Sequence, residues 1–177
     1  MKHTNYEIKA KTTIQKQEEI RDYLIKNDAK FIGIDHQIDT YFKVPEGRLK
    51  IRKGNIENTL IYYERDDGLD SKKSEILLID LNKADYLEKI TRKTHEILVE
   101  VEKQREIYFI DNVKFHLDNV VNLGKFMEIE AISENSFLSI EEIKRQCNFY
   151  KDLFRIEEKD LINYSYSDLL LKRGINK

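Results

Sequence analysis

The sequence predicts an α+β protein: a closed eight-stranded antiparallel β-barrel with peripheral helices, forming one domain over residues 1–177. Three observations support this fold class. Eight segments have the length and the residue pattern of strands. Short turn signals separate several of them, which favours hairpins and therefore antiparallel pairing. Eight strands are also enough to close a barrel around a usable interior.

The individual elements are predicted from periodicity and turn residues. Strands are expected at residues 5–12, 31–44, 48–53, 59–65, 74–80, 96–109, 113–121 and 126–132. Helices are expected at residues 15–27, 83–93, 139–154 and 166–172. Pro45-Glu46-Gly47 is a turn, because proline presets φ and glycine accepts positive φ. Asp111-Asn112 and Asn122-Leu123-Gly124 mark the turns of the last two hairpins.

The charge balance limits the range of partners. The 177 residues include 31 Lys and Arg against 33 Asp and Glu, so the formal net charge is −2. A protein that coats nucleic acid would carry an excess of basic residues. No apolar run approaches the ~18 residues that span a membrane, and the start of the chain has no signal-peptide core. We therefore expect a cytoplasmic protein without a nucleic-acid or membrane partner.

Several predicted strands alternate charged and apolar side chains, so the charges share one face of each strand. The simplest interpretation is that the charged faces are solvated and the apolar faces form an ordinary core. One strand departs from this interpretation. Its apolar face over residues 97–109 is interrupted by Lys103 and Arg105, and buried cations require counter-charges or a bound anion.

If all these charged faces line one cavity, basic side chains outnumber acidic ones there. The eight basic members are Lys9, Lys11, Arg48, Lys50, Arg52, Lys103, Arg105 and Lys114. The four acidic members are Glu7, Asp118, Glu128 and Glu130, with His116 counted as neutral. A net positive cavity predicts a small polyanion as ligand, because Arg and Lys commonly bind phosphate. The carboxylates would hold Mg²⁺ or Mn²⁺, which bridge protein carboxylates and substrate phosphates.

Six short segments together resemble the CYTH family, the triphosphate tunnel metalloenzymes, which include class IV adenylate cyclases and thiamine triphosphatases. They are Glu7-Ile8-Lys9-Ala10-Lys11, Asp39-Thr40-Tyr41-Phe42, Arg48-Leu49-Lys50-Ile51-Arg52, Lys103-Gln104-Arg105 with Tyr108, His116-Leu117-Asp118 and Gly124-Lys125-Phe126-Met127-Glu128-Ile129-Glu130. The resemblance runs from Tyr6 to about Leu171 and is greatest to the CyaB-like branch of class IV adenylate cyclases.

The resemblance implies an eight-stranded tunnel in which inward Lys and Arg grip a triphosphate and Glu holds Mg²⁺ or Mn²⁺. It assigns the metal and the catalysis to Glu7, Glu128 and Glu130. It assigns the phosphates to Lys11, Arg48, Lys50, Arg52, Lys103 and Arg105, with Arg65 and Lys73 as further candidates, and Lys9 is a phosphate ligand that this chain would add. For Arg65 and Lys73, a solvated surface position is an equal alternative. Lys114, His116 and Asp118 lie in the implied tunnel without a defined role.

One departure from the family bears on the metal. The family signature is Glu-x-Glu-x-Lys, whereas this chain has Glu7-x-Lys9-x-Lys11. In this alignment a cation replaces the second carboxylate, which removes one metal ligand and adds a phosphate ligand. We therefore expect one metal ion, or a metal that arrives with the substrate, rather than two resident metal ions.

Three functions are compatible with these residues. Hydrolysis of an inorganic or organic triphosphate needs cations that neutralise the phosphoryl group and a carboxylate that orients water. It is favoured because it requires the fewest further features. Cyclisation of ATP to cyclic AMP and pyrophosphate would also need a base pocket, and a binding module would need no catalysis. The expected partner is ATP, inorganic triphosphate or thiamine triphosphate, and a homodimer is compatible with the sequence.

Overall fold

The computed structural model describes residues 3–65, 74–134 and 137–175, which contain eight strands and four α-helices. The strands are β1 (His3–Lys11), β2 (Lys30–Phe42), β3 (Arg48–Lys53), β4 (Asn58–Arg65), β5 (Ser74–Asp80), β6 (Ile97–Ile110), β7 (Val113–Val120) and β8 (Gly124–Glu134). The helices are α1 (Ile14–Lys26), α2 (Asp85–Thr94), α3 (Ile140–Leu153) and α4 (Tyr166–Lys172). Every predicted element is present. The start of α2 lies later than predicted because Leu81–Lys83 forms a separate 3₁₀ turn.

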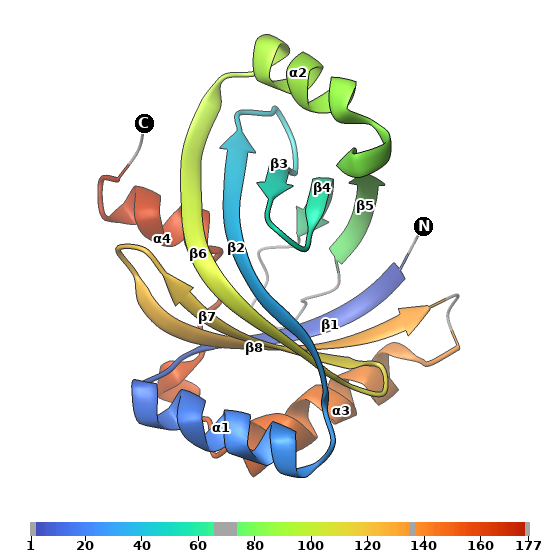
Figure 1. Cartoon of the computed structure of the whole chain (residues 1–177), viewed down its shortest axis with the longest axis vertical. Coiled ribbons are helices and arrows are strands. Elements are labelled where there is room, and N and C mark those ends of the chain that lie inside the picture. The colour runs from blue at the N-terminus through green and yellow to red at the C-terminus, as the bar shows by residue number, and fades with distance from the viewer. Residues whose placement is uncertain (1–2, 66–73, 135–136, 176–177) are drawn as a thin grey trace.

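The strands form one antiparallel sheet in the order β1-β5-β4-β3-β2-β6-β7-β8, and β8 returns to pair with β1. The predicted antiparallel barrel is therefore confirmed. Its closure is weaker than predicted, because in the described residues β1 pairs with β5 at a single position, His3 with Ile76. The long strands β2 and β6 curve side by side from one end of the barrel to the other (Figure 1).

The apolar core lies outside the barrel, between the sheet and two helices. Helices α1 and α3 lie against the β1, β7 and β8 side (Figure 1). Ile8, Phe115 and Ile129 of the strands pack there with Ile20 of α1 and Ile143 of α3, and all five are at most 5% exposed. Because strand side chains alternate between faces, burying these apolar residues turns the charged residues of the same strands into the barrel.

Helix α4 covers one end of the barrel interior. Val99 and Val101 of β6 and Phe126 of β8 point inward at this end, where they pack against Tyr166 and Leu170 of α4. The helix begins with a capping box in which the Ser165 side chain accepts a hydrogen bond from the N–H of Asp168, a contact that stabilises a helix start. The C-terminal helix therefore closes the space beneath the charged cavity.

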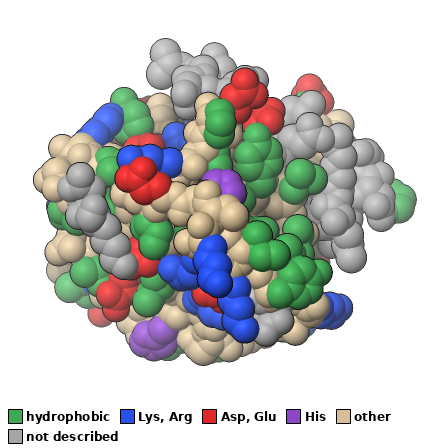
Figure 2. All heavy atoms as spheres, turned by 90° about the horizontal axis from the view of Figure 1, so that it is seen from above, with side chains coloured by type: hydrophobic (Ala, Val, Ile, Leu, Met, Phe, Trp, Pro, Cys, Tyr) green, Lys and Arg blue, Asp and Glu red, His purple; other side chains and the backbone are tan. Residues whose placement is uncertain are grey.

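Charged side chains of both signs lie side by side on the face shown in Figure 2, and apolar side chains reach the surface between them. Strand β5 contributes exposed apolar side chains, since Leu77, Leu78 and Ile79 are each more than 40% exposed. None of the helices in the described residues is both long and apolar enough to cross a membrane.

Candidate functional site

Inward side chains of all eight strands enclose a cavity of about 450 Å³, within the usual range for small-molecule sites. The predicted site residues that line it are Glu7, Lys9, Lys50, Arg52, Lys103, Arg105, Lys114, His116, Glu128 and Glu130. The strand alternation therefore brought together residues that are up to 123 positions apart in the chain. The simplest interpretation of the sequence, in which the charged faces are solvated outer faces, is therefore wrong.

Among the other predicted residues, Lys11, Arg48 and Asp118 do not line the cavity. Lys11 is exposed at the end of β1. Arg48 donates hydrogen bonds to the Ser165 and Asp168 side chains at the start of α4, at 2.7 and 2.8 Å. Asp118 is completely buried next to the cavity. Lys73 and the side chain of Arg65 lie outside the described residues.

The inward face of β1 changes the alignment of the family signature. Its cavity-lining residues are Asn5, Glu7 and Lys9, and their spacing is that of Glu-x-Glu-x-Lys. The alignment that began at Glu7 is therefore two residues too late, because it ends on the exposed Lys11. In the corrected alignment, the neutral Asn5 replaces the first carboxylate, and Lys9 is the signature lysine.

The predicted excess of positive charge in the cavity is wrong. Three lining carboxylates were missing from the prediction: Asp39 on β2, Glu57 in the β3–β4 turn and Asp80 at the end of β5. With them, six Lys or Arg and six Asp or Glu side chains line the cavity, so their formal charges cancel. His116 adds no charge at neutral pH, because burial above all lowers its pKa to about 4.

The charges are nevertheless separated in space. Asp39 is 2% exposed, and its Oδ2 atom accepts hydrogen bonds from Lys50 Nζ at 3.0 Å and Lys103 Nζ at 2.8 Å. Arg52 donates from Nε to Oδ1 at 2.8 Å and from Nη2 to Oδ2 at 2.9 Å. We call Asp39 with Lys50, Arg52 and Lys103 the cationic wall. Its three cations share the Asp39 carboxylate, and Arg52 also contacts Glu57 at 2.8 Å, so the wall keeps a net positive charge for an anionic ligand.

Burial opposes the charged forms of both Asp39 and Lys103 in the cationic wall. Burial disfavours the ionised form of Asp39, but attraction to Arg52, Lys103 and Lys50 holds the pKa of this carboxyl well below its usual range. Lys103 is 2% exposed, and burial lowers its pKa to about 7 even though Asp39 favours the ammonium. Repulsion from Arg52 and Arg105 acts in the same direction as burial. An anion that entered this wall would favour the charged ammonium.

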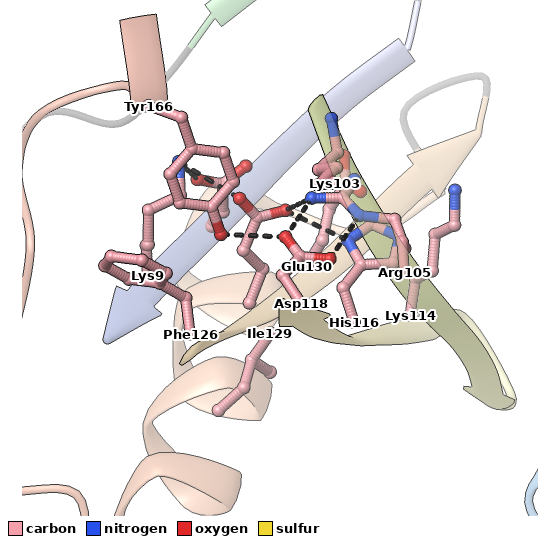
Figure 3. A network of polar contacts seen from close by, with 12 residues as sticks. Lys9, Lys103, Arg105, Lys114, His116, Asp118, Phe126, Ile129, Glu130 and Tyr166 are labelled. Carbon is pink, nitrogen blue, oxygen red and sulfur yellow. Dashed lines mark hydrogen bonds and ion pairs between the residues drawn. The ribbon is translucent and has the colours of Figure 1, made fainter. Parts of the chain in front are cut away.

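Arg105 is fixed by carboxylates next to the cationic wall. It donates from Nε to Asp118 Oδ1 at 2.7 Å, and from Nη2 to Asp118 Oδ2 at 2.5 Å and Glu128 Oε2 at 2.7 Å. Figure 3 shows Tyr166 reaching in from α4, where its hydroxyl donates to Asp118 Oδ2 at 2.7 Å. The Lys9 ammonium lies 4.5 Å from the centre of the Tyr166 ring. Helix α4 thus completes the cavity with an aromatic side chain that the sequence patterns did not identify.

Carboxylates of β1 and β8 form the other side of the cavity. Glu7 and Glu130 are direct cross-strand partners, as are Lys9 and Glu128, and we call Glu7, Glu128 and Glu130 the carboxylate wall. Glu128 has its own cations: Lys9 Nζ lies 3.0 Å from Oε1, and Arg105 binds Oε2. The His116 Nδ1 atom is also 3.0 Å from Glu128 Oε2. Glu128 is therefore committed to protein partners.

Glu7 and Glu130 fit a divalent cation better than Glu128 does. Burial, with repulsion from Glu7 and Glu128, raises the pKa of Glu130 despite attraction from Lys114. Asn5 donates to Glu130 Oε1 at 2.5 Å, while its own Oδ1 is buried without a hydrogen-bond partner among the described residues. Two carboxylates and an amide oxygen are hard ligands of the kind that Mg²⁺ and Mn²⁺ prefer.

These protein ligands would be incomplete by themselves. In the described residues, no three His, Cys, Asp or Glu side chains are arranged to hold a metal ion. Mg²⁺ commonly keeps several waters and binds one or two carboxylates together with substrate phosphates. The donor set of Glu7, Glu130 and Asn5 fits a metal whose remaining ligands come from the substrate and water.

The residues missed by the sequence interpretation differ in how they could have been found. Asp39 follows the same alternation as the predicted residues, since Asp35, Gln37, Asp39 and Tyr41 share one face of β2. Reading β2 by alternation would have identified it. Glu57 lies in a turn and Tyr166 in a helix, where no strand period applies. Their positions depend on how the turn and α4 pack against the barrel.

Comparisons with known proteins agree with this geometry. A protein from Pyrococcus horikoshii OT3 is 27% identical, with a TM-score of 0.77 over 93% of this chain and 98% of that chain. A conserved hypothetical protein from Pyrococcus furiosus is 22% identical, with a TM-score of 0.77 over 93% and 99%. A candidate adenylate cyclase from Vibrio parahaemolyticus shares the fold at 17% identity, with a TM-score of 0.70 over 95% and 98%.

No curated protein sequence matches the chain. The sequence profile of the CYTH domain matches residues 3–166, which include every strand of the barrel and the cavity residue Tyr166. The chain therefore belongs to the CYTH family.

Proposed function

We propose that the chain is a metal-dependent triphosphatase that hydrolyses inorganic or organic triphosphates in this cavity. One observation carries the proposal: three cations around the carboxylate of Asp39, two of them buried, share the cavity with the cross-strand carboxylates Glu7 and Glu130. A polyphosphate would bind Lys50, Arg52 and Lys103, and Lys9 would extend this grip from β1. Arginine and lysine stabilise phosphate charge through charge-assisted hydrogen bonds.

A divalent metal would be held by Glu7 and Glu130, with Asn5 as a neutral ligand. When bound, Mg²⁺ or Mn²⁺ supplies neutralisation of the charge on the transferred phosphoryl group. The chain's own residues supply the rest. Lys50, Arg52 and Lys103 bind and orient the phosphates, and a Glu7 or Glu130 carboxylate orients the attacking water. Arg105, fixed by Asp118, keeps Glu128 in place.

A product assay tests the proposal. The purified protein is incubated with Mg²⁺ or Mn²⁺ and, separately, with inorganic triphosphate, thiamine triphosphate and ATP. We expect release of inorganic phosphate from at least one of them, and its loss in Glu130→Gln. Glu102→Gln is the matched control, because Glu102 is exposed on β6 and the substitution removes the same charge.

The other outcomes distinguish the alternatives. Cyclic AMP with pyrophosphate from ATP would identify an adenylate cyclase and contradict the hydrolase. Tight triphosphate binding without any product would identify a binding module. Activity that Glu130→Gln leaves intact would contradict the proposed metal site, even if phosphate is released.

A further inference from the structure

The turn between β3 and β4 places a carboxylate inside the cavity. Glu57 Oε2 accepts a hydrogen bond from Arg52 Nη1 at 2.8 Å, and Glu57 Oε1 accepts one from Lys114 Nζ at 2.8 Å. Arg52 belongs to β3 and Lys114 to β7, and β2 and β6 lie between these strands in the sheet. A single side chain from a turn therefore links cations on two separate strands of the barrel.

The position of Glu57 is fixed by a buried anchor. Asp35 is completely buried, and its carboxylate accepts the backbone N–H groups of Ile56 at 2.9 Å and Glu57 at 3.0 Å. The close approach of the turn requires Gly54, since a Cβ there would lie 2.4 Å from Asp35 Oδ1. Gln37 Nε2 donates to Asp35 Oδ2 at 2.7 Å and to Glu57 Oε2 at 3.1 Å.

A second side chain pins the same turn to β2. Asn55 Oδ1 accepts the backbone N–H of His36 at 2.7 Å, and Asn55 Nδ2 donates to the carbonyl of Ile34 at 3.1 Å. The turn is thus attached to β2 through both Asp35 and Asn55. An anchored backbone holds the Glu57 carboxylate between its two cations at a low cost in side-chain entropy.

The ion pairs of Glu57 are less exposed to solvent than ordinary surface ion pairs. Its side chain is 24% exposed, and those of Arg52 and Lys114 are 11% and 15% exposed. Burial opposes ionisation of Glu57, but Arg52 and Lys114 outweigh this effect and hold the pKa of the carboxyl well below its usual range. The side chain is therefore an anion at neutral pH, bound where a phosphate oxygen would also bind.

We propose that Glu57 is an internal counter-anion that incoming phosphate groups must displace from Arg52 and Lys114, so that it sets how tightly the cavity binds phosphates. This inference rests on the proposed function, because it assumes that the ligand is a polyphosphate. Displacement costs the same for every ligand, so it lowers each affinity by the same factor. A small anion that contacts few cations then binds too weakly to occupy the cavity, whereas a triphosphate also reaches the cationic wall around Asp39 and keeps a useful affinity.

The same competition acts on the product. When a triphosphate has been cleaved, the shorter phosphate products contact fewer cations, and the anchored Glu57 carboxylate is ready to replace them. Glu57 therefore lowers the affinity for small anions and favours release of the product. It does so without contacting the reacting atoms.

Calorimetric titration of Glu57→Gln with inorganic phosphate, pyrophosphate and triphosphate tests this inference. The titrations use chelator-treated buffer at constant ionic strength, so that no metal contributes. Hydrogen bonds to charged groups contribute enough that we expect an increase of about tenfold to a hundredfold in affinity for each ligand. Glu102→Gln is the control, and it should match the wild-type protein.

Two further measurements keep the test decisive. Thermal unfolding of each variant shows whether the fold is retained. If Glu57→Gln does not fold, Glu57→Asp replaces it, because the shorter carboxylate keeps the charge but cannot reach both cations. We expect this variant to bind pyrophosphate at least about threefold more tightly, as one of two charged hydrogen bonds is weakened.

Each outcome has a defined meaning. If the wild-type protein binds triphosphate and the folded Glu57 variant binds phosphates no more tightly, the inference is overturned and the proposed function stands. Weaker binding by the variant also overturns it, because Glu57 would then assist the ligand. If neither protein binds triphosphate, with or without Mg²⁺, both the inference and the proposed function are overturned.

Discussion

The cationic wall and the carboxylate wall of the cavity bury charge in opposite ways. In the cationic wall, Lys50, Arg52 and Lys103 share one carboxylate, Asp39. In the carboxylate wall, Glu128 is paired with Lys9 and Arg105, Lys9 also lies 3.5 Å from Glu7, and Glu7 and Glu130 are cross-strand partners on the β1–β8 ladder. Each wall keeps an excess of one sign in a site that excludes much of the water. Removing a carboxylate should therefore have opposite effects on the two sides.

The largest expected effect comes from Asp39→Asn in the cationic wall. The substitution removes the counter-charge that the buried Lys50 and Lys103 share with Arg52, which also contacts Glu57. Removing one partner of a buried ion pair typically costs about 3–5 kcal/mol, so we expect the free energy of unfolding to fall by about that amount. Urea denaturation of Asp39→Asn measures this effect. Glu102→Gln, which removes an exposed carboxylate, should change stability by less than about 0.5 kcal/mol.

The effect of Asp39→Asn also has a defined pH dependence and a rescue. Asp39 has a depressed pKa, so its contribution to stability is present above the unfolded-state pKa and is lost as the pH falls through the acidic range. The difference between wild type and variant should therefore shrink in acid. A saturating polyphosphate should restore much of the lost stability, because it replaces the missing anion. Equal stability of the two proteins at neutral pH would contradict the role given to Asp39.

The lowered pKa of Lys103 predicts that ligand binding to the cationic wall depends on pH. Burial lowers its pKa to about 7 in the empty cavity, whereas a bound phosphate favours the ammonium. Above pH 7, binding must therefore take up a proton, and affinity should fall as the pH rises by at most about tenfold per unit. Calorimetry at pH 8.5 in buffers of different ionisation enthalpy measures this uptake directly.

Lys103→Met provides the control for that measurement. It removes the titrating group but keeps a side chain of similar length, so proton uptake should disappear while weaker binding persists. The wild-type protein has a second readout. Lys103 has a folded-state pKa below its unfolded value, so the unfolded chain binds more protons between pH 7 and 10.5, and stability should rise over that interval. Proton release on binding would contradict the assignment.

A substitution in the carboxylate wall should change the free energy of unfolding by less than Asp39→Asn does, and in the opposite direction. Glu130 has a raised pKa because of burial and of Glu7 and Glu128, so its ionised form is unfavourable in the metal-free protein. We expect Glu130→Gln to raise the free energy of unfolding at pH 7 by about 1 kcal/mol, an ordinary size for a single substitution. Urea denaturation in the presence of a chelator measures it.

Added Mg²⁺ or Mn²⁺ should then affect the stability of the wild-type protein and of Glu130→Gln differently. A metal that binds the folded state stabilises it, so Mn²⁺ should raise the melting temperature of the wild type and not that of Glu130→Gln. Destabilisation by Glu130→Gln in the chelator would show that Glu130 is a stabilising anion like Asp39. The distinction between the two walls would then be lost.

The alternation of side chains predicted much of the cavity lining, because strand geometry places alternate residues on opposite faces of the sheet. Once Ile8, Phe115 and Ile129 are buried against α1 and α3, their neighbours Glu7, Lys114 and Glu128 must point inward. Alternation does not show how far along the barrel the cavity extends.

The prediction for Lys11 failed, and Glu57 was missed, because the positions of both depend on the ends of elements. Lys11 has the inward parity, but β1 passes beyond the cavity there, and α4 closes that end of the barrel. Glu57 enters from a turn whose path depends on the buried Asp35. Tertiary contacts of this kind leave no periodic signal in a single sequence. The predicted net charge of the cavity was wrong partly for the same reason, since the turn residue Glu57 contributes to it, and partly because Asp39 was overlooked on β2.

The smallest expected effect is that of Lys11→Met, and its comparison with Lys9→Met tests the alignment of the family signature on β1. Lys9 is 6% exposed, and its ammonium is 3.0 Å from Glu128 in the cavity, whereas Lys11 is exposed. Lys9→Met should weaken triphosphate binding by about tenfold or more, the scale of one charged hydrogen bond. Lys11→Met should change it by less than about twofold, since an exposed charge at the barrel end is screened by solvent.

The pair is informative because the two substitutions remove the same charge from the same strand. A loss of affinity in Lys11→Met would mean that long-range charge, rather than contact, governs binding, and the effect would then disappear in high salt. A loss confined to Lys9→Met, and insensitive to salt, would place the signature at Asn5, Glu7 and Lys9. The carboxylate wall would then present one amide oxygen and the carboxylates of Glu7 and Glu130 to a metal, which favours a single ion shared with the substrate.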